Sequence, residues 1–391
     1  MSRSGEIFWT FLRLGLIAFG GPVAHLGFFR RWLVDERGWL DDATYAQTLA
    51  LCQMLPGPSS SQTGFAIGIH RGGIAGGIAA WIGFTLPSAL IMIGLGVGVT
   101  ALGGLTSAGW LAGLKLAAVA VVANALYGMA RQLCPDAPRL GIAIVAGLGA
   151  SLLPGAGGQI GMIALGALAA LLLLEQPGAA AGALSAGLSR RQGGIALGLF
   201  AAGLLALALP AGGAAELWGV LYRSGALVFG GGHVVLPLLE TGLVAPGLID
   251  ENRFLAGYGA AQAIPGPIFS FGGYLGAQIM PAQALAAGLL ATIVIFAPGL
   301  LLVAGVLPFW RDLSRLRRVR QALLGINAAV VGLVAAVLWD PILTRAIDSF
   351  SDGLIAALAL GVLATSRLPA WAVVAGCALA GELVTRLPAG L

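Results

Sequence analysis

Twice in this chain a Pro-Gly-Pro sequence interrupts a long apolar segment, at Pro56-Gly57-Pro58 and at Pro265-Gly266-Pro267. A proline lacks the backbone donor of a helix and its ring clashes with the preceding turn, so a helix cannot continue through either element. Broken backbone at membrane depth is tolerated only where protein buries it or where it lines a water-filled cavity. The two elements therefore predict broken or re-entrant helices in the interior of a membrane protein.

The composition supports a membrane location. Of the 391 residues, 58% are hydrophobic and 9% are charged, whereas soluble chains have about 25% charged residues. With about 20 apolar residues needed for each spanning helix, the apolar segments predict an all-α polytopic membrane protein. Residues 1–6 show no signal-peptide pattern, so the apolar segment 7–29 is expected to remain as the first span.

Charge and cysteine usage exclude several other classes of protein. The net charge of +5 comes from arginines clustered between apolar segments, which is typical of membrane-flanking loops rather than of a nucleic-acid surface. The three cysteines are single and widely spaced, which predicts neither a disulfide framework nor a metal site. The chain carries no phosphate-binding loop sequence for ATP, so transport energy would come from an ion gradient or the membrane potential.

The two Pro-Gly-Pro elements belong to a duplication of the chain. At a shift of 210 residues, Glu6, Arg13 and Phe19-Gly20-Gly21 fall on Glu216, Arg223 and Phe229-Gly230-Gly231. At a shift of 209 residues, Gln53, Pro56-Gly57-Pro58 and Ser61 fall on Gln262, Pro265-Gly266-Pro267 and Ser270. Chance similarity between apolar segments would not keep such rare residues aligned. We therefore expect an N-terminal transport repeat over 1–175, a linker over 176–192 and a C-terminal transport repeat over 193–391.

The charges around the repeats predict their relative orientation. The segment 30–42 carries three arginines, whereas its counterpart 239–253 is mainly acidic. Because positive loops face the cytoplasm, the halves are expected to be inverted repeats, with 30–42 and 308–320 inside and 239–253 outside. This count requires both Pro-Gly-Pro segments to re-enter and residues 139–174 to make one net crossing. It also places Arg190 and Arg191 outside, which is the observation against it.

Each break would expose the N-terminus of a second half-helix, whose N–H groups and positive dipole end favour an anionic substrate. Hydroxyls and amides could donate to the same anion, glycines permit close approach, and an intramembrane arginine is a functional hypothesis unless it reaches the interface. Kinks, backbone satisfaction and close helix packing are the structural alternatives. The candidate substrate-binding residues are Arg13, Gly20, Gly21, Gln53, Pro56, Gly57, Pro58, Ser59, Ser60, Arg223, Gly230, Gly231, Gln262, Pro265, Gly266, Pro267 and Ser270.

Four further residues are candidates for coupling to an ion gradient: His25, His233, Lys115 and Glu216. The histidines titrate near neutral pH, with hydrogen-bonded packing as the alternative. Lys115, the single lysine, could face substrate charge or a neighbouring carbonyl or carboxylate. Glu216 precedes Arg223 by seven residues, too far for the usual helical ion pair, so interfacial anchoring is its alternative role.

The motif F-G-G-P-x-x-H at 19–25 and the motif Q-x-L-P-G-P at 53–58, with F-G-G-G-H at 229–233 and Q-x-I-P-G-P at 262–267, resemble the chromate ion transporter family in its long two-domain form. The resemblance covers nearly the whole chain. It implies a carrier in the bacterial plasma membrane that exports chromate, is coupled to the proton gradient and gives chromate resistance without a cofactor.

Chromate is a tetrahedral oxydianion, and the predicted arginines, hydroxyls, amides and helix N-termini suit such a ligand. Sulfate has the same shape and charge, so a carrier for sulfate or another oxyanion remains the main alternative, and a passive channel is another. A membrane-embedded enzyme or reductase lacks a cofactor motif and a nucleophile–base pair in this sequence. The expected partners are the oxyanion and membrane lipid, with no nucleic acid, and a homo-oligomer is left open.

Overall fold

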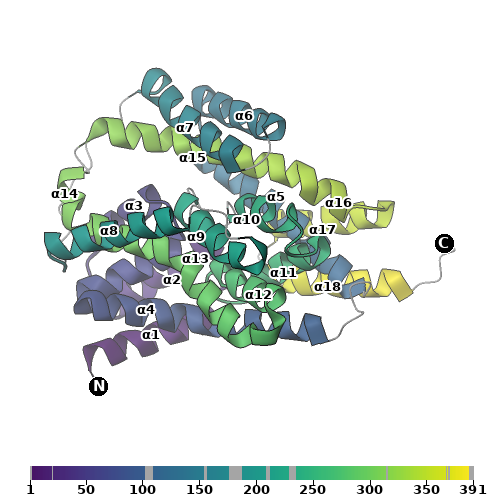
Figure 1. Ribbon diagram of the computed structural model, residues 1–391, viewed down its shortest axis with the longest axis horizontal. Helices are drawn as coiled ribbons and strands as arrows, with labels where there is room; N and C mark the ends of the chain where they lie inside the picture. The colour runs from purple at the N-terminus through teal and green to yellow at the C-terminus, as the bar shows by residue number, and fades with distance from the viewer. Residues whose placement is uncertain are drawn as a thin grey trace.

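The computed structural model describes residues 2–19, 21–101, 109–153, 156–175, 187–207, 212–228, 235–313, 316–366, 368 and 370–386. Within these ranges the fold is helical, without strands (Figure 1). The helices of the first half are α1 (Arg3–Ile17), α2 (Gly21–Phe29), the π-helical η1 (Arg30–Glu36), α3 (Asp42–Met54), α4 (Ser59–Ala101), α5 (Gly109–Leu133), α6 (Ala137–Leu152) and α7 (Ala156–Leu173).

The rest of the chain begins with one additional helix. Its main elements are α8 (Arg190–Ala206), α9 (Glu216–Leu227), α10 (Val235–Leu239), the π-helical η5 (Glu240–Val244), α11 (Glu251–Ala263), η6 (Ile268–Ser270), α12 (Phe271–Ile279), α13 (Ala284–Val306), α14 (Trp310–Leu313), α15 (Arg317–Val337), η9 (Leu338–Leu343), α16 (Thr344–Ala346), α17 (Phe350–Thr365) and α18 (Ala370–Arg386). The helix α8 starts inside the expected linker, and no other described helix corresponds to it under the repeat shifts.

The helix boundaries confirm the duplication. The helices α3 and α11 coincide at both ends under the shift of 209 residues, and η1 and η5 begin 210 residues apart. Both α3 and α11 start after an aspartate, Asp41 or Asp250, whose side chain accepts the N–H of a first-turn residue. Such a cap satisfies a donor that the helix leaves open. The donation from Thr44 also holds the pKa of Asp41 below its usual value.

The first half of the chain begins at one end of the molecule and comes back to that end twice. Glu6 forms ion pairs with Arg37 at 3.7 Å and with Arg71 at 3.5 Å, so α1, the end of η1 and the first part of α4 share that end. The expected span over 7–29 is therefore wrong, because α1 and α2 fold back as a hairpin. The helix α3 and the first part of α4 form the re-entrant hairpin that the Pro-Gly-Pro element predicts.

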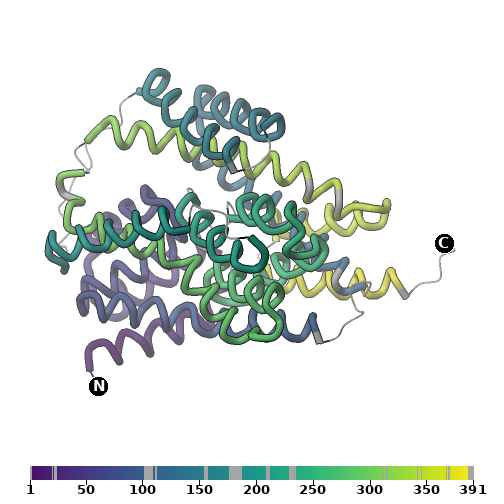
Figure 2. The backbone as a smooth tube through the Cα atoms, viewed as in Figure 1, coloured from purple at the N-terminus to yellow at the C-terminus, as the bar shows by residue number. Residues whose placement is uncertain are grey.

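The chain then turns at Gly72 and Gly73, and the remainder of α4 runs to the opposite end. The tube in Figure 2 follows this path. At that opposite end, the Tyr274 hydroxyl of α12 donates to the Arg253 carbonyl of α11 at 2.8 Å, and Gln278 donates to Gly96 O at 2.6 Å. The helices α11 and α12 thus form the second re-entrant hairpin, which enters from the other side.

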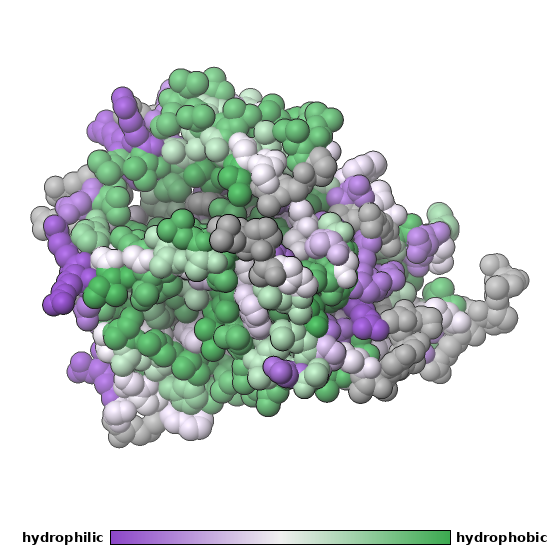
Figure 3. All heavy atoms as spheres, in the orientation of Figure 1, coloured by the Kyte–Doolittle hydropathy of each residue, from purple (hydrophilic) through white to green (hydrophobic). Residues whose placement is uncertain are grey.

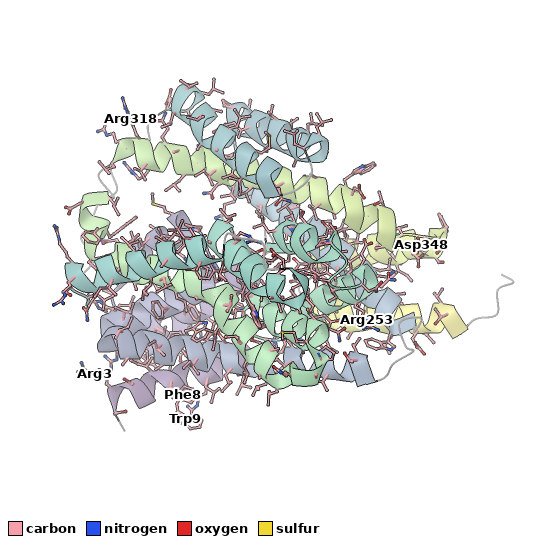
Figure 4. The ribbon with its side chains drawn as sticks, viewed as in Figure 1. Arg3, Phe8, Trp9, Arg253, Arg318 and Asp348 are labelled. Atoms are coloured by element: carbon pink, nitrogen blue, oxygen red, sulfur yellow. The ribbon has the colours of Figure 1, made fainter. Side chains whose placement is uncertain are left out.

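The two ends of the molecule are separated by a hydrophobic band (Figure 3). Arg3 and Arg318 lie at one end and Arg253 and Asp348 at the other (Figure 4), as expected for inverted repeats. We call the first the arginine-rich end. Arg190 pairs with Asp312 at 2.9 Å, which places the start of α8 beside α14 at the arginine-rich end. The expected outside position of Arg190 is therefore wrong, and the objection to inversion disappears with it.

The last two helices of each repeat pack on a helix of the opposite half. The pair α6 and α7 packs on α15 of the second half, and the pair α17 and α18 packs on α5 of the first. Glycines permit the close approach: a Cβ on Gly325 would lie 2.0 Å from Gly166 O, and one on Gly113 would lie 2.1 Å from Cys377 O. Small residues at helix contacts are typical of membrane proteins.

Four described helical stretches are long and apolar enough to cross a membrane. They are Ser59–Thr100, Ala112–Leu133, Pro281–Phe309 and Arg317–Asp340. The first of these includes the re-entrant part of α4, so its crossing portion begins after the turn at Gly73. The two re-entrant hairpins reach the centre of the molecule between these long helices.

Candidate anion-binding site

The two Pro-Gly-Pro elements make the same contact with the opposite half. Gly57 N donates to Val228 O at 2.6 Å, and Gly266 N donates to Ala18 O at 3.0 Å. Ala18 and Val228 are repeat equivalents that follow α1 and α9. Each half therefore supplies one hairpin that ends on the other half. His25 joins the two ends, because its Nε2 contacts the Ala18 carbonyl that accepts from Gly266 and its Nδ1 contacts Ser60 Oγ.

Only glycine suits the middle position of each element. Gly57 has a φ of 129° and Gly266 a φ of 98°, where L-residues are strained. The space is also filled, because a Cβ on Gly57 would lie 2.9 Å from Gly299 Cα and one on Gly266 would lie 2.9 Å from Ser88 Oγ. Ser88 and Gly299 follow the prolines inside α4 and α13, so the two long helices form the walls of the centre.

Gln62 fixes the first element in place. Its Nε2 donates to Pro56 O at 2.7 Å and to Gly299 O at 3.1 Å, so one amide joins the Pro-Gly-Pro loop of the first half to α13 of the second. The repeat equivalent of Gln62 is Phe271, which stacks on Tyr274 with centroids 5.8 Å apart. The second element therefore has the same backbone contact but a phenylalanine in place of the amide that links the first element to α13.

Four buried donors near the breaks have no hydrogen-bond partner among the described residues. Ser61 and Ser270, which are repeat equivalents in the first turns after the two breaks, are 2% and 0% exposed, and neither Oγ is paired. Thr85 Oγ1 and Trp81 Nε1 on α4 are unpaired as well. A buried polar atom without a partner costs about 1–3 kcal/mol. A ligand with several acceptor oxygens would satisfy such donors.

Aromatic rings join the elements that carry these donors. Trp81 of α4 packs edge-on against Phe296 of α13 at 5.8 Å, and Phe269 of η6 lies 5.5 Å from the same ring. This arrangement links the crossing helices of both halves to the start of the second re-entrant helix. It keeps the surroundings of the unpaired donors apolar, where a hydrogen bond is electrostatically stronger than in water.

Several predicted site residues have structural partners. His25 Nε2 lies 3.0 Å from Ala18 O and its Nδ1 lies 3.3 Å from Ser60 Oγ, which supports the packing alternative for both residues. Ser59 O accepts the hydroxyl of Thr63. Gln262 forms a side-chain hydrogen bond with Tyr258. Its equivalent Gln53 is exposed on α3.

Four predicted residues, Gly20, Gly230, Gly231 and His233, lie outside the described residues. Gly21, which follows the first of them, starts α2 with a φ of 75° and has open space where a Cβ would be. Lys115 donates to Asn252 Oδ1 at 3.0 Å, so its neighbour is an amide carbonyl, and this contact lies on the α5–α11 side of the molecule.

The two predicted arginines occupy different surroundings. Arg13 is exposed and lines a shallow surface pocket with Glu6, Trp9, Thr10 and Arg37; Trp9, on the same helix, lies at the outer edge of the molecule (Figure 4). Arg223 donates to Leu207 O and pairs with Glu216 Oε1 at 2.6 Å. Glu216 and Arg223 thus form an ion pair across seven residues, beyond the usual i,i+4 spacing, which the sequence did not predict.

Sequence reasoning did not select Ser61, Thr85 or Trp81 as ligands. The repeat alignment already placed Ser61 on the selected Ser270, and this signal could have identified it. Thr85 and Trp81 have non-polar or dissimilar equivalents, Phe296 and Thr292, so the duplication does not mark them. Their importance becomes visible only when burial and hydrogen bonding are known.

Comparison with known proteins agrees with these motifs. The sequence profile named chromate transporter matches residues 5–208 and 215–382. The chain is 29% identical to a chromate transport protein of Pseudomonas aeruginosa, over 89% of this chain and 86% of the relative. It is 28% identical to a probable chromate transport protein of Synechococcus elongatus, over 95% and 93% of the two chains.

A chromate transport protein of Cupriavidus metallidurans is 26% identical over 96% of this chain and 92% of its own length. No solved structure matches the chain significantly. The profile matches both halves, on either side of the region between α8 and α9. The chain is a polytopic membrane protein of two homologous halves and belongs to the chromate transporter family.

Proposed function

We propose that this protein is a secondary carrier that exports chromate across the bacterial plasma membrane and binds it between the two Pro-Gly-Pro elements. The observation that carries the proposal is the pair of hydrogen bonds from Gly57 to Val228 and from Gly266 to Ala18. These bonds hold two half-helix starts, which enter from opposite ends, at one place. The positive dipole ends of such helices favour an anion.

The proposed side-chain ligands are Ser61, Ser270, Thr85 and Trp81, because each is a buried donor that lacks a partner. All four are neutral, so they donate hydrogen bonds without a full opposing charge. A carrier must release its substrate as well as bind it, and neutral donors hold a dianion less tightly than an arginine clamp would. The glycines and prolines of the breaks shape the site by keeping the backbone open.

The charge distribution supports the direction of transport. Arginines gather at the end where Arg3 and Arg318 lie in Figure 4, since Arg37 and Arg71 pair there with Glu6 and Arg190 pairs with Asp312. The positive-inside rule assigns such an end to the cytoplasm. A basic surface there would concentrate a dianion before it binds. Coupling to the proton gradient is part of the proposal, since the sequence carries no ATP-binding motif.

The test is flux of labelled chromate in proteoliposomes of known protein orientation, with and without an imposed proton gradient. We expect chromate to leave the compartment that faces the arginine-rich end. The rate of chromate flux should rise when the imposed gradient drives protons in the direction opposite to chromate. Excess sulfate distinguishes the oxyanions: full inhibition, together with sulfate flux at an equal rate, would contradict chromate as the preferred substrate. Absence of chromate flux would contradict the proposal as a whole.

A further inference from the structure

The equivalent helices α3 and α11 are covered to different extents. On α11, residues 254–261 are all buried, because α5 and α18 pack along this helix. On α3, Ala43, Ala46, Ala50 and Gln53 are exposed, and their spacing places them on one face of the helix. The repeat equivalents of this exposed face are the residues of α11 that lie toward α5.

The contact between α5 and α11 is close and specific. A Cβ on Gly259 would lie 2.3 Å from Leu114 O, so the absence of a side chain is what lets α5 approach. Lys115 donates to Asn252 Oδ1 at 3.0 Å at the outer part of the same contact. Leu114, Ala117 and Val121 of α5 form one apolar cluster with Ala256 and Ala260 of α11.

The other half lacks this contact. Among the described residues α15, the equivalent of α5, packs on α6 and α7 but not along α3. Figure 3 shows the molecule hollowed at the upper left between α15 and α8, and in Figure 1 α3 lies behind α8. The exposed residues Arg317 and Arg318 begin α15 beside this hollow, at the arginine-rich end.

We infer that the exposed face of α3 is the access route of the oxyanion from the arginine-rich end and that α5 on α11 is the closed gate at the opposite end. The inference rests on the proposed function, since it describes how substrate reaches the same centre. During transport, α5 would leave α11 and α15 would close on α3. The centre, where each Pro-Gly-Pro element bonds to the opposite half, keeps its contacts in both states.

The two closures are chemically unequal. The equivalents of Gly259 and Asn252 on α3 are Ala50 and Ala43, and the equivalent of Lys115 on α15 is Ile326. The α5–α11 closure therefore has a glycine contact and a polar latch, and the α15–α3 closure has neither. This difference favours the state that is open toward the arginine-rich end when no substrate is bound.

The test uses thiol labelling in a background in which Cys52, Cys134 and Cys377 are replaced by alanine. Ala46→Cys and Leu255→Cys are matched reporters, since the two positions are repeat equivalents and Leu255 is 1% exposed. With a membrane-impermeant maleimide, we expect Ala46→Cys to react rapidly from the arginine-rich side and Leu255→Cys to react at least about tenfold more slowly from either side. Equal rates in the two reporters would overturn the inference.

Gly259→Val tests the gate itself. The larger side chain should hold α5 away from α11 and raise labelling of Leu255→Cys from the side opposite the arginine-rich end by about tenfold. The matched control Ala50→Val, on the exposed face of α3, should leave that rate unchanged. A rate that does not rise with Gly259→Val in the folded protein would contradict the gate.

Asn252→Ala is a milder second variant that removes the latch from an exposed position, so folding should not be affected. Labelling of Leu255→Cys should then rise about threefold, and an unchanged rate would show that the latch does not hold the gate. Labelling requires no substrate. If the labelling rates are as expected but chromate flux is absent, the proposed substrate is rejected and the gate is kept. If chromate flux is present but the labelling rates are not as expected, the gate alone is rejected.

Discussion

At the centre of the molecule Gly57 and Gly266 make equivalent hydrogen bonds to the opposite halves, whereas farther out α11 is covered by α5 and α18 and its equivalent α3 is not. The shared contact involves backbone atoms and glycines, which the duplication preserves. The unequal contact involves side chains and the position of a whole helix. The comparison teaches that the repeats have one common core, around which the outer helices take different positions.

Different residues determine the structure of the shared centre and of the outer contacts. Glycines and prolines fix the backbone of the centre, where a conformation that other residues reach only with strain is required. Small residues line the contacts of the outer helices, where they permit close packing. A substitution at the centre should therefore affect both halves together, and one at the periphery should affect a single end.

The largest effect is expected for Gly57→Ala. The positive φ alone costs on the order of 1–3 kcal/mol in an L-residue, and the clash with Gly299 Cα adds about 1–3 kcal/mol. We expect a lower unfolding temperature in detergent and loss of chromate flux. Gly38→Ala is the matched control, because Gly38 also has a positive φ of 59° but no atom within 4 Å of an added Cβ. Equal losses in the two variants would refute the interlocked centre.

A smaller effect is expected for Thr85→Val, which removes a buried hydroxyl without a partner. Since hydrogen bonds to charged groups contribute about 1.5–3 kcal/mol, chromate affinity should fall roughly tenfold or more while stability stays the same or rises. Thr292→Val is the control, because that buried hydroxyl already donates to Gly288 O and affinity should change less than about twofold. Equilibrium binding of chromate to the purified protein distinguishes these outcomes, and an unchanged affinity in Thr85→Val would remove this residue from the site.

The smallest effects on transport are expected for the two arginines. Arg223→Ala breaks an ion pair whose side chains are 29% and 19% exposed, so the free energy of unfolding should fall by about 1–3 kcal/mol. Arg13→Ala, at an exposed position, should change it by less than about 0.5 kcal/mol. Thermal unfolding and chromate flux are measured for both. A strong loss of flux with normal stability in Arg13→Ala would place that residue in the transport path after all.

The sequence was sufficient for the parts of the fold that depend on local chemistry. Repeated rare residues established the duplication, the prolines established the breaks, and the arginines of segment 30–42 predicted the inversion. The prolines act on the backbone within a few residues, and the arginines act through a charge that must stay in water. The position of Arg190 was not predictable in the same way, because it depended on one net crossing by residues 139–174. These residues instead form the hairpin of α6 and α7, in which Pro138 and Leu173 line one pocket and Leu174 O accepts from Gln321 near the start of α15.

The candidate site was predictable only in its backbone. Gly57 and Gly266 lie where the breaks indicate. Ser60 Oγ, however, contacts the His25 ring, and Arg223 forms an ion pair with Glu216. Whether a hydroxyl or a guanidinium is available to a ligand depends on partners from distant parts of the chain. Sequence spacing does not specify those partners, so Ser61 and Thr85 emerged only from the three-dimensional arrangement.

The central claim is that the two half-helix starts form one anion site to which Ser61 and Ser270 contribute equally. The most direct measurement is equilibrium chromate binding to the purified protein and to the variants Ser61→Ala, Ser270→Ala and the double variant. The account predicts a similar loss of roughly tenfold in each single variant, a larger loss in the double variant, and an unchanged unfolding temperature throughout. Chromate affinity in the double variant equal to that of the parent would contradict the claim.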